Sequence, residues 1–270
     1  HENSSAASDV YKRQAPSFSG GEPDQWVCEP PLPSGLTLGQ DGSISGIPDH
    51  VGSTNHTITG SNNGGSAYAS LNITTIHASP DSIDYGGESF TFSIGQPVSL
   101  SPSVPGGQIT AWSVNPDLLS GLSISQSGEI SGIPSALQPT TEYTITAENS
   151  GGSVSTSILI EVIDLPIWDL EYSQQSFDLS VGDVILTNSP VWGGGSPTSW
   201  HVSPPLPNGF QMDQWTGEIS GTATDLQEWS THTIWANNTG GGDFTEVSFR
   251  VIDQPPNQIT WEIQEIALPS

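Results

Sequence analysis

The sequence predicts an all-β fold of tandem β-sandwich repeats, and it does so through its composition, the alternation of its apolar residues and an internal repeat. Glycine and proline are frequent, with 30 and 22 copies in 270 residues, whereas charged residues make up only 12%. Such a composition is typical of short strands linked by turns rather than of long helices. A chain of this length can hold two or three domains, each with its own core.

A seven-residue motif recurs three times along the chain. It reads GSISGIP ending at Pro48, GEISGIP ending at Pro134 and GEISGTA ending at Ala223, so the copies lie 86 and 89 residues apart. A tryptophan, a proline-containing turn and an asparagine that precedes a glycine pair recur in the same order. These landmarks are Trp26, Trp112 and Trp200, the turns that begin at Pro30, Pro116 and Pro204, and Asn62, Asn149 and Asn238. Several landmarks in one order at one spacing indicate a true repeat.

Period-two alternation divides each repeat into strands. In the second repeat Tyr143, Ile145 and Ala147 alternate with threonines, and the apolar positions of 158–162 alternate in the same way. Strands with one apolar face, separated by Pro and Gly turns, predict a sandwich of two sheets. A repeat of this length is too long for a propeller blade. Trp26, Trp112 and Trp200 are therefore expected at equivalent core positions, with little helix anywhere in the chain.

The combined pattern resembles a known repeat family. It runs W-x-V-x-P-x-L-P-x-G-L, then G-x-I-S-G-I-P, then Y-T-I-T-A-x-N-x-G-G, and closes on V-I-D. This resembles the putative-immunoglobulin, cadherin-like tandem-repeat family of large bacterial and archaeal surface proteins, over roughly residues 16–253. The resemblance implies immunoglobulin-like sandwiches and an extracellular or cell-surface location. The first repeat departs from it at His56, which replaces Tyr143, and the third departs through an extra residue near Trp215 and through Ala223 in place of proline.

The landmarks divide the chain into five segments. The string AASDVYKRQ near the N-terminus holds two of the three basic residues and resembles translated sequencing-adapter read-through, so it is set apart from the repeats. The expected segments are an aberrant leader at 1–14, a first repeat lacking its first strands at 15–79, a second repeat at 80–165, a third repeat at 166–254, and the first strand of a fourth repeat or a donor strand at 255–270.

The charge, the hydropathy and the cysteine content argue against several classes of function. The net charge is −26, from 29 acidic and three basic residues, so the surface repels phosphate backbones and nucleic acid is not expected as a partner. No apolar run is long enough for a membrane span in this segment. The single Cys28 cannot form an intrachain disulfide and is expected to act as a small apolar residue. No motif of a nucleophile, base and carboxylate recurs beside the histidines, so we expect no catalytic residues, no enzymatic activity and no organic cofactor.

Calcium is the inorganic ligand worth considering, because acidic residues gather where the repeats join. These residues are Asp81, Asp84, Asp164, Asp169 and Asp253. Calcium requires six to eight oxygen ligands, and no joint carries the dense D-x-N-D-N string of cadherin linkers. The alternatives are interdomain calcium and solvated linker charge.

Two features of the sequence, its tryptophans in the third repeat and its sequons, indicate possible contact with glycans. Tryptophan is concentrated in the third repeat, where Trp235 and Trp192 are candidates for stacking against a sugar or for packing against a neighbouring domain. The sequons at Asn55, Asn72 and Asn237 all fall on outward strand positions, as attachment of a glycan requires. We therefore expect glycosylation on some of these three asparagines.

The leading function is a structural surface protein, a stalk or filament in which sandwiches act as spacers. Alternatives are a carbohydrate-binding or host-binding adhesin and a non-catalytic appendage of a secreted enzyme. In the leading case copies assemble head to tail, since residues 258–268 resemble the opening of a fourth repeat and the first repeat has no counterpart of those strands. The same features fit one continuous longer array. The candidate donor residues are Ile259, Trp261, Ile263 and Ile266.

Overall fold

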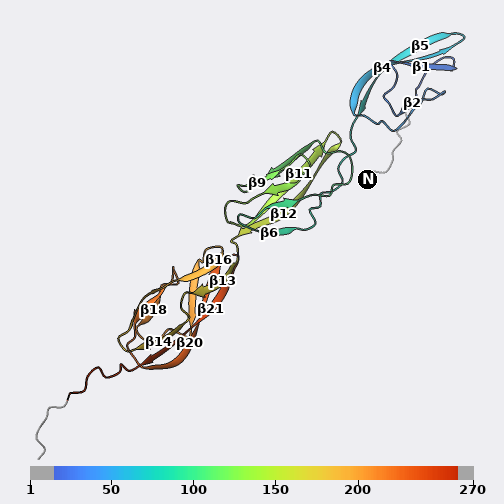
Figure 1. Cartoon of the computed structure of the whole chain (residues 1–270). Coiled ribbons are helices and arrows are strands. Elements are labelled where there is room, and N and C mark those ends of the chain that lie inside the picture. The colour runs from blue at the N-terminus through green and yellow to red at the C-terminus, as the bar shows by residue number, and fades with distance from the viewer. Residues whose placement is uncertain (1–14, 261–270) are drawn as a thin grey trace, which may run out of the picture.

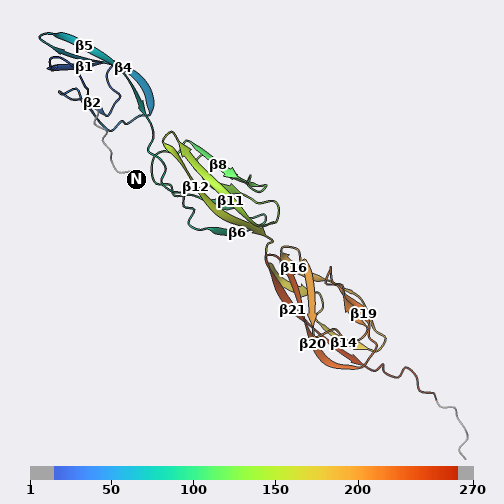
Figure 2. The ribbon, with the colours of Figure 1, turned by 180° about the vertical axis from the view of Figure 1, so that it is seen from behind.

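A computed structural model describes residues 15–260 of the chain. In this part of the chain every regular element is a β-strand, as the sequence predicts. The strands form three units that follow one another in a line, which Figures 1 and 2 show from opposite sides. We call them units 1, 2 and 3 in chain order.

Unit 2 is a sandwich of two sheets. Its larger sheet has the order β6-β12-β11-β8 and its smaller sheet has the order β7-β10-β9. β6 runs parallel to β12, and the other pairings are antiparallel. The strands are β6 (Ser89–Ser93), β7 (Val98–Leu100), β8 (Ala111–Asn115), β9 (Leu122–Ile124), β10 (Ile130–Gly132), β11 (Gln138–Asn149) and β12 (Gly152–Ile163).

Unit 3 repeats this architecture and adds a two-stranded sheet. The order β14-β21-β20-β17 corresponds to the larger sheet of unit 2, and β15-β19-β18 corresponds to the smaller one, while β13 pairs with β16. The strands are β13 (Ile167–Tyr172), β14 (Ser176–Ser180), β15 (Val184–Asn188), β16 (Pro190–Gly194), β17 (Ser199–Ser203), β18 (Phe210–Met212), β19 (Ile219–Thr222), β20 (Gln227–Asn238) and β21 (Gly241–Ile252).

Unit 1 has fewer strands within the described residues. Its sheets have the orders β1-β4-β5 and β2-β3. The strands are β1 (Gln25–Glu29), β2 (Leu36–Leu38), β3 (Ile44–Gly46), β4 (Gly52–Asn62) and β5 (Gly65–Thr75). Between residues 15 and 75 there is no counterpart of β6 or β14, so the outer edge of β5 has no described partner.

The cores follow the predicted alternation. In unit 2, Tyr143, Ile145 and Ala147 of β11 are buried against the inward residues of β12, and the corresponding residues of β20 and β21 are buried in unit 3. Burial of these alternating side chains provides the main stabilisation of each sandwich. The matching positions of unit 1, Leu71 and Ile73 of β5, are only half-buried.

The three repeat tryptophans occupy equivalent places, as predicted. Their Cα partners across the sheet are Gly60, Ala147 and Ala236. Each indole lies on a turn glycine of positive φ, so close that a Cβ on that glycine would approach the ring within 2.4 to 2.7 Å. These glycines are Gly42, Gly128 and Gly217, with φ of 77°, 81° and 70°.

Candidate functional site

The joints between units are built on the repeated asparagine. In unit 2, Asn149 Nδ2 donates to the carbonyl oxygens of Ala78, in the incoming linker, at 2.7 Å and of Gln108 at 3.1 Å. Its Oδ1 accepts from the backbone N–H groups of Gly151 and Gly152 at 2.8 and 3.2 Å. The side chain is 5% exposed and uses both ends of its amide. It therefore ties the β11–β12 turn to the segment that enters the unit.

Unit 3 repeats the arrangement. Asn238 Nδ2 donates to the carbonyl oxygen of Leu165 at 2.8 Å, and its Oδ1 accepts from the N–H of Gly240 at 2.9 Å. We call each set a linker clasp, formed by Asn149 and Gly151 in unit 2 and by Asn238 and Gly240 in unit 3. In unit 1, Asn62 Nδ2 donates instead to the carbonyl oxygen of Glu22, within that unit, at 3.1 Å.

The residue after the clasp asparagine adds a second connection. Ser150 Oγ accepts from the backbone N–H of His77 at 3.0 Å, and Thr239 Oγ1 accepts from that of Asp164 at 2.9 Å. Thr239 Oγ1 also donates to Asp164 Oδ2 at 2.8 Å. At each joint, one backbone N–H and one backbone carbonyl oxygen of the linker are thereby bonded to side chains of the hairpin turn.

The clasp glycine leaves room for the linker backbone. A Cβ on Gly151 would lie 2.1 Å from the carbonyl oxygen of His77, and one on Gly240 would lie 2.0 Å from that of Asp164. No side chain fits at such distances, so the glycine is required where the linker crosses the turn. The linkers are short, because β5 ends at Thr75, two residues before His77, and β12 ends at Ile163, directly before Asp164. Short linkers held in this way restrict bending between units.

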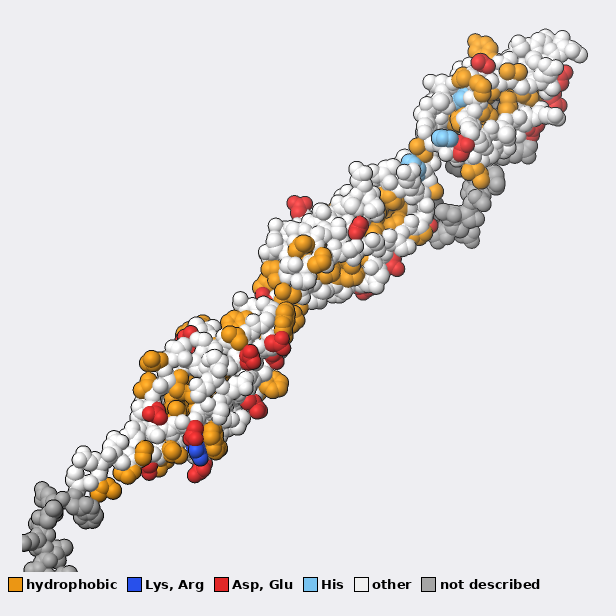
Figure 3. Space-filling view, viewed as in Figure 1, with side chains coloured by type: hydrophobic (Ala, Val, Ile, Leu, Met, Phe, Trp, Pro, Cys, Tyr) orange, Lys and Arg blue, Asp and Glu red, His pale blue; other side chains and the backbone are white. Residues whose placement is uncertain are grey.

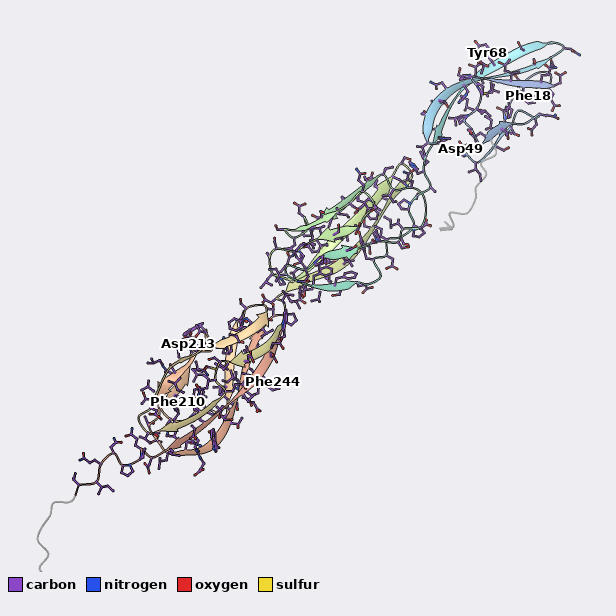
Figure 4. The ribbon with its side chains drawn as sticks, viewed as in Figure 1. Phe18, Asp49, Tyr68, Phe210, Asp213 and Phe244 are labelled. Atoms are coloured by element: carbon purple, nitrogen blue, oxygen red, sulfur yellow. The ribbon has the colours of Figure 1, made fainter. Side chains whose placement is uncertain are left out.

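Unit 1 carries a hollow of about 390 Å³ where units 2 and 3 have a filled core. It is lined by apolar side chains that include Phe18, Trp26, Ile58, Tyr68 and Leu71. The rings of Phe18 and Trp26 lie 6.2 Å apart, and Tyr68 is 78% exposed. Apolar side chains are visible over unit 1 in Figure 3, and Figure 4 labels Phe18 and Tyr68 there.

The edge of β12 in unit 2 that corresponds to the open edge of β5 is paired with β6. Its residues Ser89–Ser93 run parallel to Leu159–Ile163 of β12, and Phe90 and Phe92 pack onto the core. In unit 3, β14 contributes Phe177, which is 3% exposed and stacks on Phe249 with ring centroids 4.9 Å apart. The open edge of β5 therefore matches an edge that the other units pair with a strand. The hollow, which is lined by Gly42 and by residues 67–71 of β5, matches the place that Tyr85 takes in unit 2 and Tyr172 of β13 takes in unit 3, where each tyrosine hydroxyl donates to the carbonyl oxygen of the turn glycine.

The acidic residues proposed for calcium are dispersed across the joints. Asp164 is engaged by Thr239, and the backbone N–H of Asp84 is paired with Ser103, while Asp81 and Asp253 are exposed. Asp169 adopts a positive φ of 53° at the start of β13's register shift. Within residues 15–260, no group of three or more His, Cys, Asp or Glu side chains is arranged to hold a metal ion. Calcium at the joints stays an expectation from sequence.

The structure places the two proposed sugar-stacking tryptophans on different surfaces. Trp192 packs edge-on against Trp200, with ring centroids 5.8 Å apart and an angle of 73°. Trp235 pairs with His201 at 5.4 Å on the outward face of the larger sheet. Trp200 and His201 are successive residues of β17, so their side chains point to opposite faces of the sheet. Trp192, which contacts Trp200, and Trp235, which contacts His201, therefore lie on opposite faces.

The three sequon asparagines, Asn55, Asn72 and Asn237, are all exposed. Asn55 and Asn72 face each other across β4 and β5, and Asn72 Nδ2 donates to Asn55 Oδ1 at 2.8 Å. Two glycans at directly opposed positions would compete for the same space, so we expect at most one of this pair to be modified. The proposed donor residue Ile259 is exposed, whereas Trp261, Ile263 and Ile266 lie outside the described residues.

The histidines have structural partners that sequence patterns did not reveal. His56 Nδ1 lies 2.9 Å from the carbonyl oxygen of Pro30, and His232 Nδ1 lies 3.0 Å from that of Pro204. In each case Nε2 bonds a hydroxyl two residues earlier, from Thr54 at 2.6 Å or from Ser230 at 2.8 Å. Both rings are buried and bind the turn that follows the repeat tryptophan. The recurrence of that proline turn was the signal that could have indicated this role.

Comparison with known proteins agrees with this architecture. The model of the family described as putative Ig domain matches residues 72–163, about a third of the chain. Residues 72–163 are an immunoglobulin-like domain. Because the landmarks of this segment recur in all three units, the chain is a tandem array of immunoglobulin-like repeats. No curated protein matches the chain.

Three of the solved structures that align with the chain hold several consecutive domains. Extracellular domains 3–5 of Drosophila OTK align with 14% identity and a TM-score of 0.36, covering 82% of this chain and 78% of theirs. The I67–I69 fragment of the titin I-band aligns with 15% identity and a TM-score of 0.38, covering 85% and 87%. Immunoglobulin domains 1–5 of Sidekick-1 align with 13% identity and a TM-score of 0.35, covering 85% of this chain and 52% of that one.

Proposed function

We propose that this chain is a non-enzymatic, extracellular structural protein whose immunoglobulin-like repeats act as spacers in a surface stalk or filament. The observation that carries the proposal is the linker clasp, which recurs with the same donors and acceptors at both joints. A protein that acts as a spacer needs joints that resist bending as well as folded units. The acidic surface, distributed along all three units in Figure 3, supports a solvated and extended chain. Within residues 15–260 no helix is long and apolar enough to cross a membrane.

Head-to-tail assembly is the second part of the proposal. An unpaired strand edge exposes backbone donors and acceptors that accept an added strand. The edge of β5 is of this kind, and the apolar hollow beside it offers positions for alternating side chains. The donor is residues 258–268 of another copy, or the corresponding segment within a continuous longer array. A contact between unlike surfaces propagates as a filament where successive copies do not close into a ring.

Small-angle scattering and negative-stain imaging of the purified chain test the spacer role. We expect single particles with three beads in a line and a narrow distribution of angles at both joints. A compact particle, or units that take every relative orientation, would contradict the proposal. Assembly is read independently from the concentration dependence of particle length.

A further inference from the structure

Unit 3 departs from unit 2 at two tryptophans, and both line one hollow. The hollow has a volume of about 360 Å³ and is lined by Trp192, Trp200, Trp215 and Glu218, among others. Trp200 is the repeat tryptophan, so it has a counterpart in unit 2. The glycine pairs of the two units align Trp192 with Val104, which packs against the core of unit 2. Trp215 is the extra residue of the turn that unit 2 makes with Ser125–Gly128.

Neither added tryptophan belongs to the buried core of unit 3, although Trp192 packs edge-on against Trp200. Trp215 is 75% exposed and Trp192 is 38% exposed, and the core cluster of unit 3 contains neither of them. Exposed indole surface is unfavourable in water, and a concentration of it on one surface is typical of a binding site. The hollow lies within the size range of small-molecule sites.

The turn that carries Trp215 is held in place by hydrogen bonds within the protein. Asp213 Oδ1 accepts from the N–H groups of Trp215 and Thr216, each at 2.8 Å. The backbone N–H of Gly217 donates to the carbonyl oxygen of Asp213 at 2.9 Å, and the buried hydroxyl of Tyr172 donates to that of Gly217. An aromatic side chain on a fixed turn loses little conformational entropy on binding.

Polar groups accompany the indoles in the hollow. Glu218 is half-buried, and its Oε1 accepts from Ser189 Oγ at 3.0 Å, which orients the carboxylate. Ser196 and Thr216 add hydroxyl groups to the lining. Unit 2 has a similar pair, Ser99 with Glu129, but without the two tryptophans.

We propose that this hollow binds a neutral pyranose unit of a polysaccharide. The apolar C–H face of the ring packs on the indoles, and its hydroxyls donate to Glu218 and exchange hydrogen bonds with the neighbouring hydroxyl groups. Anionic sugars are disfavoured by Glu218 and by the net charge of −26. This activity goes beyond the spacer role and depends on neither the clasps nor the assembly.

Trp235 provides a matched control, because it is a half-exposed tryptophan of the same unit on another surface. It lies opposite Phe244 across β20 and β21. In Figure 4 the labelled Asp213 and Phe244 lie on opposite sides of unit 3. Trp235→Ala therefore removes the same side chain without touching the hollow.

The experiment is affinity electrophoresis of the full chain in gels containing single soluble polysaccharides. The neutral probes are a β-glucan, a mannan and a galactomannan, and the acidic probes are alginate and chondroitin sulfate. We expect at least one neutral probe to retard the protein and neither acidic probe to do so. Trp215→Ala and Trp192→Ala should each weaken the association constant by about tenfold, whereas Trp235→Ala should leave it unchanged. Near-ultraviolet circular dichroism verifies that unit 3 stays folded in each variant.

Three results would overturn the proposal. The first is that no neutral probe retards the chain, and the second is that Trp215→Ala and Trp192→Ala bind as well as the parent. The third is a concentration-dependent association of the protein alone that Trp215→Ala abolishes in analytical ultracentrifugation. That result would assign the hollow to a contact between copies.

Discussion

At the scale of single residues, each landmark of the repeat has a structural reason. The tryptophan closes one end of the core by lying on a turn glycine, as Trp112 does on Gly128. The asparagine holds the incoming linker, as Asn149 holds Ala78. Side chains with such specific environments recur in every unit because few substitutions reproduce both their shape and their hydrogen bonds.

The first prediction concerns Gly128. Gly128→Ala places a Cβ 2.4 Å from the indole of Trp112 at a φ of 81°, so backbone strain and overpacking act together. We expect unit 2 to lose about 2 to 4 kcal/mol of stability. Hydrogen exchange of β11 and β12 in the full chain measures this loss.

Gly95→Ala is the matched control. Gly95 has a similar φ of 73°, but an added Cβ would have no neighbour within 4 Å among the described residues. It should lose only the backbone contribution of about 1 kcal/mol. Equal effects of the two substitutions would mean that contact between the glycine and the tryptophan contributes nothing.

The second prediction concerns Asp213 and pH. The N–H groups of Thr216 and Trp215 hold the pKa of this carboxyl below its ordinary value. A lowered pKa in the folded state means that the carboxylate contributes stability above its unfolded pKa of about 3.9, which is lost as pH falls through the folded pKa. We expect the fluorescence of Trp215, taken as the difference between the parent and Trp215→Phe, to change reversibly below about pH 4. An unchanged difference spectrum down to pH 2 would contradict this role of Asp213.

At the scale of strands and turns, the joint is the element that gives the chain its form. Each clasp turn lies between the two longest strands of its unit, such as β20 and β21 of unit 3. The asparagine is thus placed at the turn of the longest hairpin of the sandwich, and this turn holds the linker.

The third prediction concerns Asn238. Asn238→Ala leaves the N–H of Gly240 without its partner and leaves the carbonyl oxygen of Leu165 with only the longer bond from the Gly195 N–H, at 3.3 Å. We expect unit 3 to lose about 1 to 3 kcal/mol and the joint between units 2 and 3 to bend more freely. Scattering should show a shorter mean length, and hydrogen exchange should rise at 164–168. Asn237→Ala changes the neighbouring exposed asparagine and should alter neither. If Asn238→Ala keeps the parent's length and exchange, the clasp does not stiffen the joint.

The fold could be predicted from the sequence because strand alternation and glycine turns are local signals. The positions of Trp26, Trp112 and Trp200 were correctly predicted from the repeat alone. The role of Asn149 and Asn238 was not, although their recurrence was visible, because their partners lie about 70 residues earlier in the chain. The hollow at Trp215 was missed for a similar reason, since turn geometry brings Trp192 and Trp215 together and no sequence spacing records it.

At the scale of the whole molecule, the three units differ in how completely they are packed. Units 2 and 3 each have an extensive buried core, whereas the core of unit 1 is limited to a few side chains such as His56 and Ile58. The least packed unit is therefore also the one with an open strand edge. A surface that a partner strand would complete is expected to be less stable without that strand.

The last prediction concerns assembly. If residues 258–268 of one copy complete unit 1 of the next, the full chain should form linear particles whose length grows with concentration, and a variant ending at residue 254 should stay monomeric. Adding the peptide 255–270 to that shortened variant should stabilise unit 1 selectively, because ligand binding to the folded state raises its stability. Hydrogen exchange of β4 and β5 would report this protection, and β20 and β21 of unit 3 serve as the internal control within the same molecule. Denaturing electrophoresis of native fibres then distinguishes strand exchange between chains from one continuous array, because only a continuous array keeps its length when denatured.

Two results would exclude strand complementation by this segment: a full chain that remains monomeric at all concentrations, or a peptide that protects unit 3 as much as unit 1. Slower hydrogen exchange confined to β5 and to the residues that line the hollow would identify this edge as the acceptor. These are the described groups of unit 1 that an added strand would cover.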